Sequence, residues 1–187
     1  MSVELAKLNF RTFVKHGGEM YRLLDSNREI LRPWFWWAGK KTSTKLRFYM
    51  VMLLFLTDDK RKKIAHKFDS TRLYDEQFIV YNNNGQIGGM CGLDDIDITE
   101  KKDAEIWGMA FKGNKETIES VKILENYCVE TLGLTSIYGK VQSNNIPSRF
   151  FWGRYGYDNK TVQRNVRVFD STPKLIDIYT YTKYLSL

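Results

Sequence analysis

The chain has 187 residues and a formal net charge of +7 at pH 7, with 43% hydrophobic and 27% charged residues. This length and composition are ordinary for one folded domain, here residues 1–187, with a substantial core. The longest uninterrupted apolar run, residues 48–56, is too short to span a bilayer, and Cys91 and Cys128 suggest neither a disulfide framework nor a zinc site. The N-terminus has no basic-then-apolar leader, so we expect a cytoplasmic protein without a membrane partner.

In chain order, the first part of the sequence predicts one strand and two helices. Residues 5–13 have strand character. Residues 19–31 carry apolar side chains at helical spacing, and Pro33 stops that helix. Residues 42–63 predict a long helix with a charged end that frays into solvent, and its apolar face is predicted at Leu46, Met50, Leu53 and Leu54.

The rest of the sequence predicts strands that alternate with helices. A hairpin is predicted from strands at 77–81 and 86–93, around an Asn/Gly turn at 82–85. The remaining elements are a strand at 104–111, a helix at 116–130, a strand at 136–141, a short helix at 147–154 and a final strand pair at 162–169 and 175–183. Together they predict an α+β fold, a mixed and mostly antiparallel sheet with helices on both faces.

The segment 141–157 carries the most informative pattern in the chain. It combines the end of a strand, a capped helix start at Asn145, one apolar helical face and a glycine turn at Gly156 into an aromatic residue. That order resembles the Asn-x-x-Ser … Gly-Phe signature of GNAT N-acetyltransferases, and within them the branch that acetylates the N-termini of ribosomal proteins. Segments 27–34, 85–89, 104–106 and 132–134 resemble further elements of that branch, in its order.

The resemblance implies a GNAT fold and an enzyme that transfers acetyl from acetyl-CoA to an amine by direct attack, without a metal. The acceptor would be a protein N-terminus or a small-molecule amine. Ribosome association and a homodimer are further expectations of the same resemblance.

The pyrophosphate loop of the family, Gln/Arg-x-x-Gly-x-Gly/Ala, is altered here. Lys115 stands where the first motif glycine belongs, and Thr117 where the small residue belongs. Such glycines let backbone N–H groups approach phosphates at a helix N-terminus. Gly113 and Asn114 keep some of that backbone tolerance, and Lys112 and Lys115 would supply charge. The alternative is a catalytically degenerate GNAT-fold interaction module with weakened CoA binding.

Ser148 and Glu105 are the predicted catalytic residues. Ser148 occupies the position where this branch carries a serine credited with protonating the CoA thiolate; the alternative is a serine that satisfies the helix backbone. Trp152 falls where many other GNATs place an acidic tyrosine, and an indole cannot serve as the acid. Glu105 is the candidate base, because the attacking amine must lose a proton; the alternative is an outward-facing strand residue. The resemblance places Asn145 against the pantetheine arm, a role that can coexist with capping.

Backbone N–H groups of a strand and a group of tryptophans complete the predicted site. Family geometry implies that the oxyanion is held by Gly108, Met109 and Ala110. The acceptor pocket is predicted to include Trp34, Trp36 and Trp37, with core packing as the alternative.

Two further patterns carry weaker interpretations. The positive charge and the aromatic residues together leave an RNA- or ribosome-binding protein as a third hypothesis. Asp94-Asp95-x-Asp97 lacks the glycine and glutamate of a calcium loop, so it is predicted to be a solvated turn.

Overall fold

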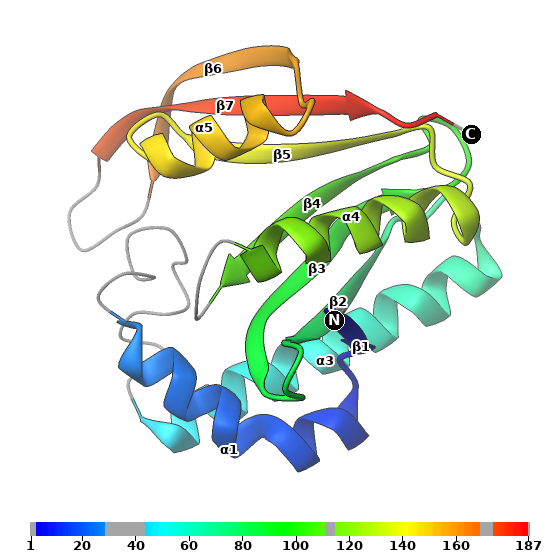
Figure 1. The fold of residues 1–187 in the computed structure, drawn as a ribbon. Helices are drawn as coiled ribbons and strands as arrows, with labels where there is room; N and C mark the ends of the chain where they lie inside the picture. The colour runs from blue at the N-terminus through cyan, green and yellow to red at the C-terminus, as the bar shows by residue number, and fades with distance from the viewer. Residues whose placement is uncertain (1–2, 29–43, 111–114, 169–173, 187) are drawn as a thin grey trace.

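The computed structural model describes residues 3–28, 44–110, 115–168 and 174–186. Its strands form one sheet in the order β1-β2-β3-β4-β5-β7-β6, in which β4 and β5 pair parallel and all other neighbours antiparallel (Figure 1). The strands are β1 (Glu4–Lys7), β2 (Tyr74–Tyr81), β3 (Ile87–Asp97), β4 (Asp103–Ala110), β5 (Ser136–Gln142), β6 (Asn159–Val168) and β7 (Lys174–Tyr184). The described helices are α1 (Phe10–Ser26), α3 (Lys45–Phe68), α4 (Lys115–Glu130) and α5 (Ile146–Arg154). The predicted α+β class with a mixed sheet is confirmed.

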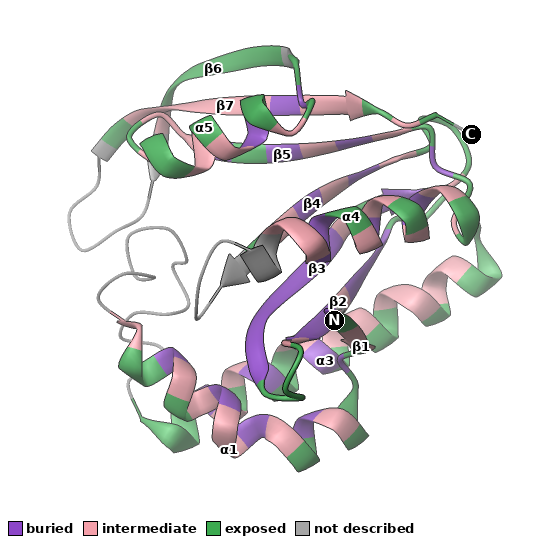
Figure 2. Ribbon diagram, in the orientation of Figure 1, coloured by how far each residue is buried: buried purple, intermediate pink, exposed green. Residues whose placement is uncertain are grey.

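The two faces of the sheet bury separate apolar clusters (Figure 2). One cluster joins the sheet to α4 and α5 and includes Ile106, Leu124 and Trp152. The other joins the sheet to α1 and α3 and includes Met20 and Met52. The strands β2, β3 and β4 therefore present alternate residues to two different helix layers.

The start of α1 corrects the prediction for the N-terminal region. The strand ends at Lys7, and the helix begins at Phe10 instead of residue 19. Asn9 Oδ1 accepts from Thr12 N at 3.0 Å, while Asn9 N donates to Thr12 Oγ1 at 2.8 Å. This reciprocal cap satisfies two backbone N–H groups, and it fixes the helix start inside the segment predicted as strand. Gly17 lies within the helix, where an added Cβ would approach Phe13 Cε2 at 2.9 Å.

The long helix forms as α3, but the predicted apolar face is wrong. The helix starts after its cap Thr44 and continues to Phe68 without fraying at residue 63. Its buried residues are Phe48, Met52 and Leu56, on the side that packs against the sheet and α1. The residues predicted to face the core, Leu46, Met50, Leu53 and Leu54, are exposed. Both sides of this part of the helix are apolar, so periodicity alone could not choose between them.

The later elements lie close to their predicted positions. The 82–85 turn joins β2 to β3, with Gly85 at φ 69° and Asn82 Oδ1 accepting from Asn84 N and Gln86 N. β3 is longer than predicted and runs through 94–97, so the predicted solvated turn is wrong. Asp94, Asp95 and Asp97 therefore belong to a strand of the sheet.

Candidate active site

β4 and β5 part immediately beyond one pair of residues. Glu105 and Tyr138 are the Cα partners that join them in the described chain, whereas every residue of β5 pairs with β7. Figure 1 shows the two strands diverging toward their C-terminal ends, with α4 and α5 beside the opening. Beyond Glu105, alternate backbone N–H groups of β4 point toward the side that β5 has left. This edge includes Gly108, where an added Cβ would meet no atom within 4 Å.

Glu105 lies on the α1–α3 face of the sheet, beside this parting. Its strand neighbours Ala104 and Ile106 are buried on the α4–α5 face, so alternation places Glu105 on the other. Glu105 Oε2 accepts from Lys140 Nζ of β5, and the two side chains are 20% and 46% exposed. The predicted base is thus half-buried and ion-paired, and it faces neither bulk solvent nor the apolar core.

Asp94 lies next to Glu105 and was missed as a site residue by the sequence analysis. It is the β3 partner of Glu105, and its Oδ1 accepts from Trp107 Nε1 at 3.0 Å. The indole lies over Gly92, where an added Cβ would come within 2.7 Å of the ring. Extending the period-two alternation of the preceding strand by two residues would have placed Asp94 on this face.

Two carboxyls on this face titrate near neutral pH. Burial raises the pKa of Asp94 to about 6, against the hydrogen bond from Trp107 and with the help of neighbouring carboxylates, first among them Asp75. Burial and then Asp75 raise the pKa of Asp59 of α3 to about 7, although Lys63 opposes the shift. The α1–α3 side of the parting therefore carries groups that can accept and release protons at physiological pH.

The start of α5 supplies the other side of the opening. Asn145 Oδ1 accepts from Ser148 N at 3.2 Å, and Pro147 occupies the first turn, so the predicted cap is confirmed. Ser148 is half-buried. Because α5 packs on the α4–α5 face and Glu105 lies on the other, the structure places Ser148 and Glu105 on opposite sides of the sheet.

Two aromatic residues near α5 are structural. Trp152 is buried, and its ring lies 2.9 Å from where a Cβ on Gly139 would stand. Tyr157 is also buried, and its hydroxyl donates to Glu125 Oε1 at 2.9 Å. Burial and the Glu125 carboxylate raise the pKa of Tyr157 far above its usual range. Neither side chain is placed to donate a proton to a leaving group.

The other predicted binding residues belong to β4, to α4 or to segments outside the described residues. Met109 and Ala110 belong to β4 and Lys115 and Thr117 to α4, whose first residue is Lys115. The helix therefore begins within the predicted phosphate loop, at Lys115. The predicted residues that lie outside the described part of the chain are Trp34, Trp36, Trp37, Lys112, Gly113 and Asn114.

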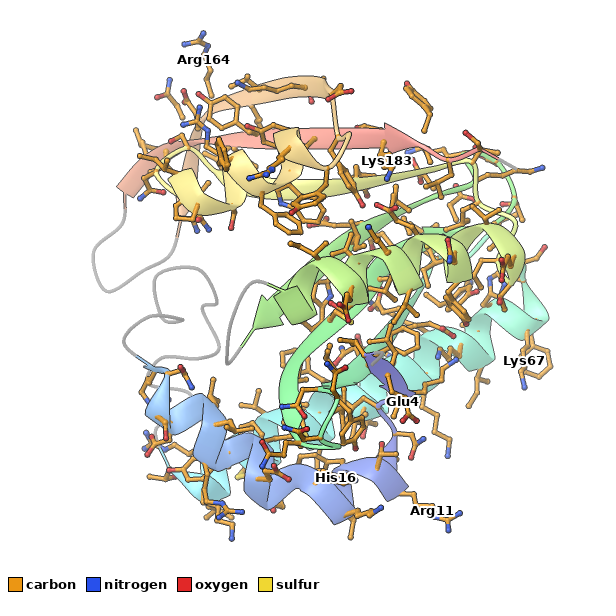
Figure 3. All side chains as sticks on the ribbon, viewed as in Figure 1. Glu4, Arg11, His16, Lys67, Arg164 and Lys183 are labelled. Carbon is orange, nitrogen blue, oxygen red and sulfur yellow. The ribbon has the colours of Figure 1, made fainter. Side chains whose placement is uncertain are left out.

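The charge of the protein is distributed over several sides. Figure 3 shows Arg11, Lys67 and Arg164 pointing outward at three separate edges of the molecule, whereas Lys183 Nζ donates to Glu125 Oε2 at 2.7 Å. Among the residues that the structure describes, no three or more His, Cys, Asp or Glu side chains are grouped as metal ligands would be. The helices in the same part of the chain are all too short or too polar to cross a membrane.

The comparisons with known proteins identify the family. A family model for the acetyltransferase (GNAT) domain matches residues 56–173. No curated protein gives a match to the sequence. The structure is similar to the microcin C7 self-immunity acetyltransferase MccE in complex with acetyl-CoA and AMP, with a TM-score of 0.76, 16% identity and coverage of 97% of this chain and 93% of that chain.

Two further solved structures share the fold. RimL, a ribosomal L7/L12 alpha-N-protein acetyltransferase in complex with CoA, gives a TM-score of 0.71 at 14% identity, over 99% of this chain and 95% of that chain. Spermidine N-acetyltransferase from Vibrio cholerae, in complex with CoA and spermine, gives 0.67 at 16% identity, over 98% and 95%. With the family model covering more than half of its length, the chain belongs to the GNAT family of acetyltransferases.

Proposed function

We propose that this protein transfers the acetyl group of acetyl-CoA directly to the amine of a protein N-terminus or a small molecule. The observation that carries the proposal is the parting of β4 and β5 at Glu105 and Tyr138, with carboxylates on one side and the capped start of α5 on the other. A thioester between the strands would meet backbone N–H groups on the edge of β4. RimL and the spermidine acetyltransferase are named for acceptors of these two kinds.

The residues around the parting fit the donor. Backbone N–H groups in the segment 108–110 would hold the carbonyl oxygen as it gains negative charge. The Asn145 side chain would contact the pantetheine arm, and Lys112, Gly113, Asn114, Lys115 and Thr117 would surround the pyrophosphate at the start of α4. Acetyl-CoA supplies an activated acyl group, so the protein has to orient the amine, accept protons from it and donate a proton to the leaving thiolate.

Glu105 and Ser148 would manage those protons from opposite sides. The amine enters from the α1–α3 side and loses a proton to Glu105, which frees the nitrogen lone pair to attack the carbonyl carbon. Asp94, with a pKa raised to about 6 chiefly by burial, is the acceptor next to it for the second proton of the nitrogen. When the carbon–sulfur bond breaks, the Ser148 hydroxyl donates a proton to the departing thiolate on the α5 side and regains one from solvent.

The acceptor side carries the neighbouring carboxyls Asp94 and Glu105, which would suit an amine as acceptor. Lys140 pairs with Glu105, and Lys62 pairs with Asp75 further along this face. Trp34, Trp36 and Trp37 would add apolar contact in the acceptor pocket. An acceptor on a ribosomal protein would bring the enzyme to the ribosome in the cytoplasm.

Calorimetric titration with acetyl-CoA, followed by thiol-release assays with N-terminal peptides and with spermine, tests this proposal. We expect saturable binding and turnover of one acceptor class, with Glu105→Gln and Ser148→Ala each lowering kcat/KM by about 10²-fold or more while donor binding is retained. The altered loop at Lys115 and Thr117 favours the competing function, an interaction module. A folded protein that gives no heat with acetyl-CoA, and that gains binding in Lys115→Gly, would establish that alternative.

A further inference from the structure

Trp107 is a half-buried residue of β4, two positions beyond Glu105. Side chains two apart on a strand share a face, so Trp107 and Glu105 occupy adjacent positions on the α1–α3 face. Their direct partners on β3 are Gly92 and Asp94. These four residues are therefore neighbours in the β3–β4 ladder, next to the register at which β5 parts from β4.

The indole of Trp107 crosses the ladder diagonally to reach Asp94. Its Nε1 donates to Asp94 Oδ1 at 3.0 Å, a diagonal cross-strand contact that a long aromatic side chain can make. The ring lies over Gly92, where an added Cβ would come within 2.7 Å of it. The absence of a side chain at Gly92 is therefore what lets the indole lie close against β3 and meet the carboxylate.

The backbone that follows Asp94 is fixed from β2. The β3–β4 register shifts just after Asp94, and Asp95 within this irregularity has φ 54°, in the left-handed region. Asp95 N donates to Asp75 Oδ1 at 3.0 Å, while Asp75 Oδ2 accepts from Lys62 Nζ of α3 at 2.5 Å. Irregularities of this kind re-aim a neighbouring side chain. Asp94 is therefore held at its carboxylate by the indole and at the following peptide by Asp75.

The surroundings of Asp94 disfavour its charged form. Burial raises its pKa to about 6, and the hydrogen bond from Trp107 opposes that shift. The charged groups around it come from five elements: Asp75 of β2, Asp95 of β3, Glu105 of β4, Lys140 of β5, and Asp59 and Lys62 of α3. The two lysines are paired, Lys62 with Asp75 and Lys140 with Glu105. A neutral side chain would accept the same hydrogen bond without the cost of burying a charge, so a carboxyl at this position indicates proton transfer.

We infer that Trp107 is a positioning residue of the acetyl transfer: its indole N–H holds the Asp94 carboxylate beside Glu105, on the side from which the amine enters. The inference rests on the proposed function, in which Asp94 takes the second proton of the amine nitrogen. Trp107 exchanges no proton itself, because an indole N–H is a donor only. It acts by fixing one oxygen of the carboxylate and by favouring the ionised form, which is the form that accepts a proton.

Trp107→Phe tests the inference, because phenylalanine keeps a ring over Gly92 and lacks the N–H donor. Loss of this donor favours protonated Asp94, so the ratio of variant to wild-type kcat/KM should be about one-fifth at pH 6 and close to one at pH 8.5. The KM for acetyl-CoA should not change. Tyr21→Phe is the control, because it removes a polar group from an aromatic ring that packs on the same apolar cluster as Trp107. Its ratio should stay close to one at both pH values.

Asp75→Asn should change the pH dependence in the opposite direction. Asparagine keeps an oxygen for Asp95 N and removes a charge that opposes ionisation of Asp94. Its ratio to wild-type kcat/KM should therefore be about twofold higher at pH 5.5 than at pH 8.5. Circular dichroism checks that each variant remains folded.

Asp94→Asn shows whether Trp107 acts through Asp94. This variant keeps an oxygen for the indole and cannot ionise, so it should lower kcat/KM, and adding Trp107→Phe to it should bring no further pH-dependent change. A Trp107→Phe ratio that is the same at every pH would overturn the inference, because a lost packing contact acts alike at every pH. Wild-type kcat/KM in Asp94→Asn would overturn it as well. Failure of the proposed function would appear differently, as wild-type protein that releases no thiol at any pH.

Discussion

Lys140 Nζ donates to Glu105 Oε2 across the register at which β4 and β5 pair, so one ion pair bridges the two strands where they begin to part. The ion pair fixes the position of the predicted base. In Lys140→Met this contact is gone, so the Glu105 carboxylate is no longer held where it would meet the amine. We expect kcat/KM to fall by about tenfold or more while binding of acetyl-CoA is retained, measured by thiol release and by calorimetry.

A matched pair of variants separates this effect from a general loss of charge. Lys140→Arg should keep most of the wild-type kcat/KM, because it keeps the ion pair. Lys160→Met should also keep it, because Lys160 of β6 lies over the ring of Tyr179, with Nζ 4.1 Å from the ring centroid. Equal kcat/KM values for Lys140→Met and wild type would contradict a catalytic role for the Glu105–Lys140 pair.

Asn145 has two roles that different substitutions can separate. Asn145→Ala removes the cap that accepts from Ser148 N, and it should cost about 1 kcal/mol of unfolding free energy. Asn145→Asp retains a capping oxygen but lacks the amide N–H donors. If the amide contacts pantetheine, the aspartate variant keeps its stability in urea unfolding and shows a higher KM for acetyl-CoA. Unchanged KM in both variants would leave Asn145 with the cap alone.

Asp59 makes stability depend on pH in a direction opposite to that of a salt-bridged carboxylate. Burial and then Asp75 raise its pKa from 3.8 to about 7 in the folded state. The folded chain therefore binds this proton more tightly, and the resulting stability is present below pH 4 and is lost as the pH rises to about 7. Asp59→Asn cannot ionise, so we expect it to exceed wild type in urea unfolding at pH 8 and to match it near pH 4.

Glu76 of β2 connects its strand to β1, α3 and α4. Its contribution to stability should depend on pH in the direction opposite to that of Asp59. Glu76 Oε1 accepts from Lys7 Nζ at 2.5 Å and Lys63 Nζ at 2.9 Å, and its Oε2 accepts from Tyr127 Oη at 2.6 Å. Burial alone would raise the pKa of Glu76, but these hydrogen bonds together lower it. Its contribution to stability is then present above the unfolded-state pKa and lost as the pH falls through the folded one.

The substitution Glu76→Gln should cost about 1–3 kcal/mol at pH 7, because the buried Glu76 site loses its charge-assisted hydrogen bonds to the partly exposed Lys7 and Lys63. The deficit should shrink in acid, where wild type loses the same interaction. Urea unfolding at pH 7 and pH 3.5 measures both values. A deficit of equal size at both pH values would mean that packing and not charge accounts for the loss.

The sequence predicts the elements of this fold better than their orientation. Asn145 and Pro147 mark the start of α5 through local capping chemistry, which needs no tertiary information. The outward side of α3 was mistaken for the inward one, since Leu46 and Phe48 are equally apolar and only packing against the sheet distinguishes them. Asn9 was overlooked as a cap because its partner, Thr12, completes the box in place of the usual Glu or Gln.

Only part of the candidate site could be predicted from the sequence. The family signature indicated Glu105 and Ser148, but a one-dimensional pattern does not show that Lys140, thirty-five positions away, meets Glu105. Asp94 was not predicted as a site residue, because the three aspartates at positions 94, 95 and 97 suggest a solvated turn. Its burial results from the length of β3, which pairing with β4 determines.

The parting of β4 and β5 also affects how the fold is held together. Backbone pairing divides the sheet into two half-sheets, β1–β4 and β5–β7–β6, and the described join between them is the Glu105–Tyr138 register. A thioester arm bound between the half-sheets would hydrogen-bond to the open edge of β4. It would then connect the two half-sheets as well as supply the acetyl group. The angle between the half-sheets, and with it the melting temperature, would then report on donor occupancy without any acceptor present.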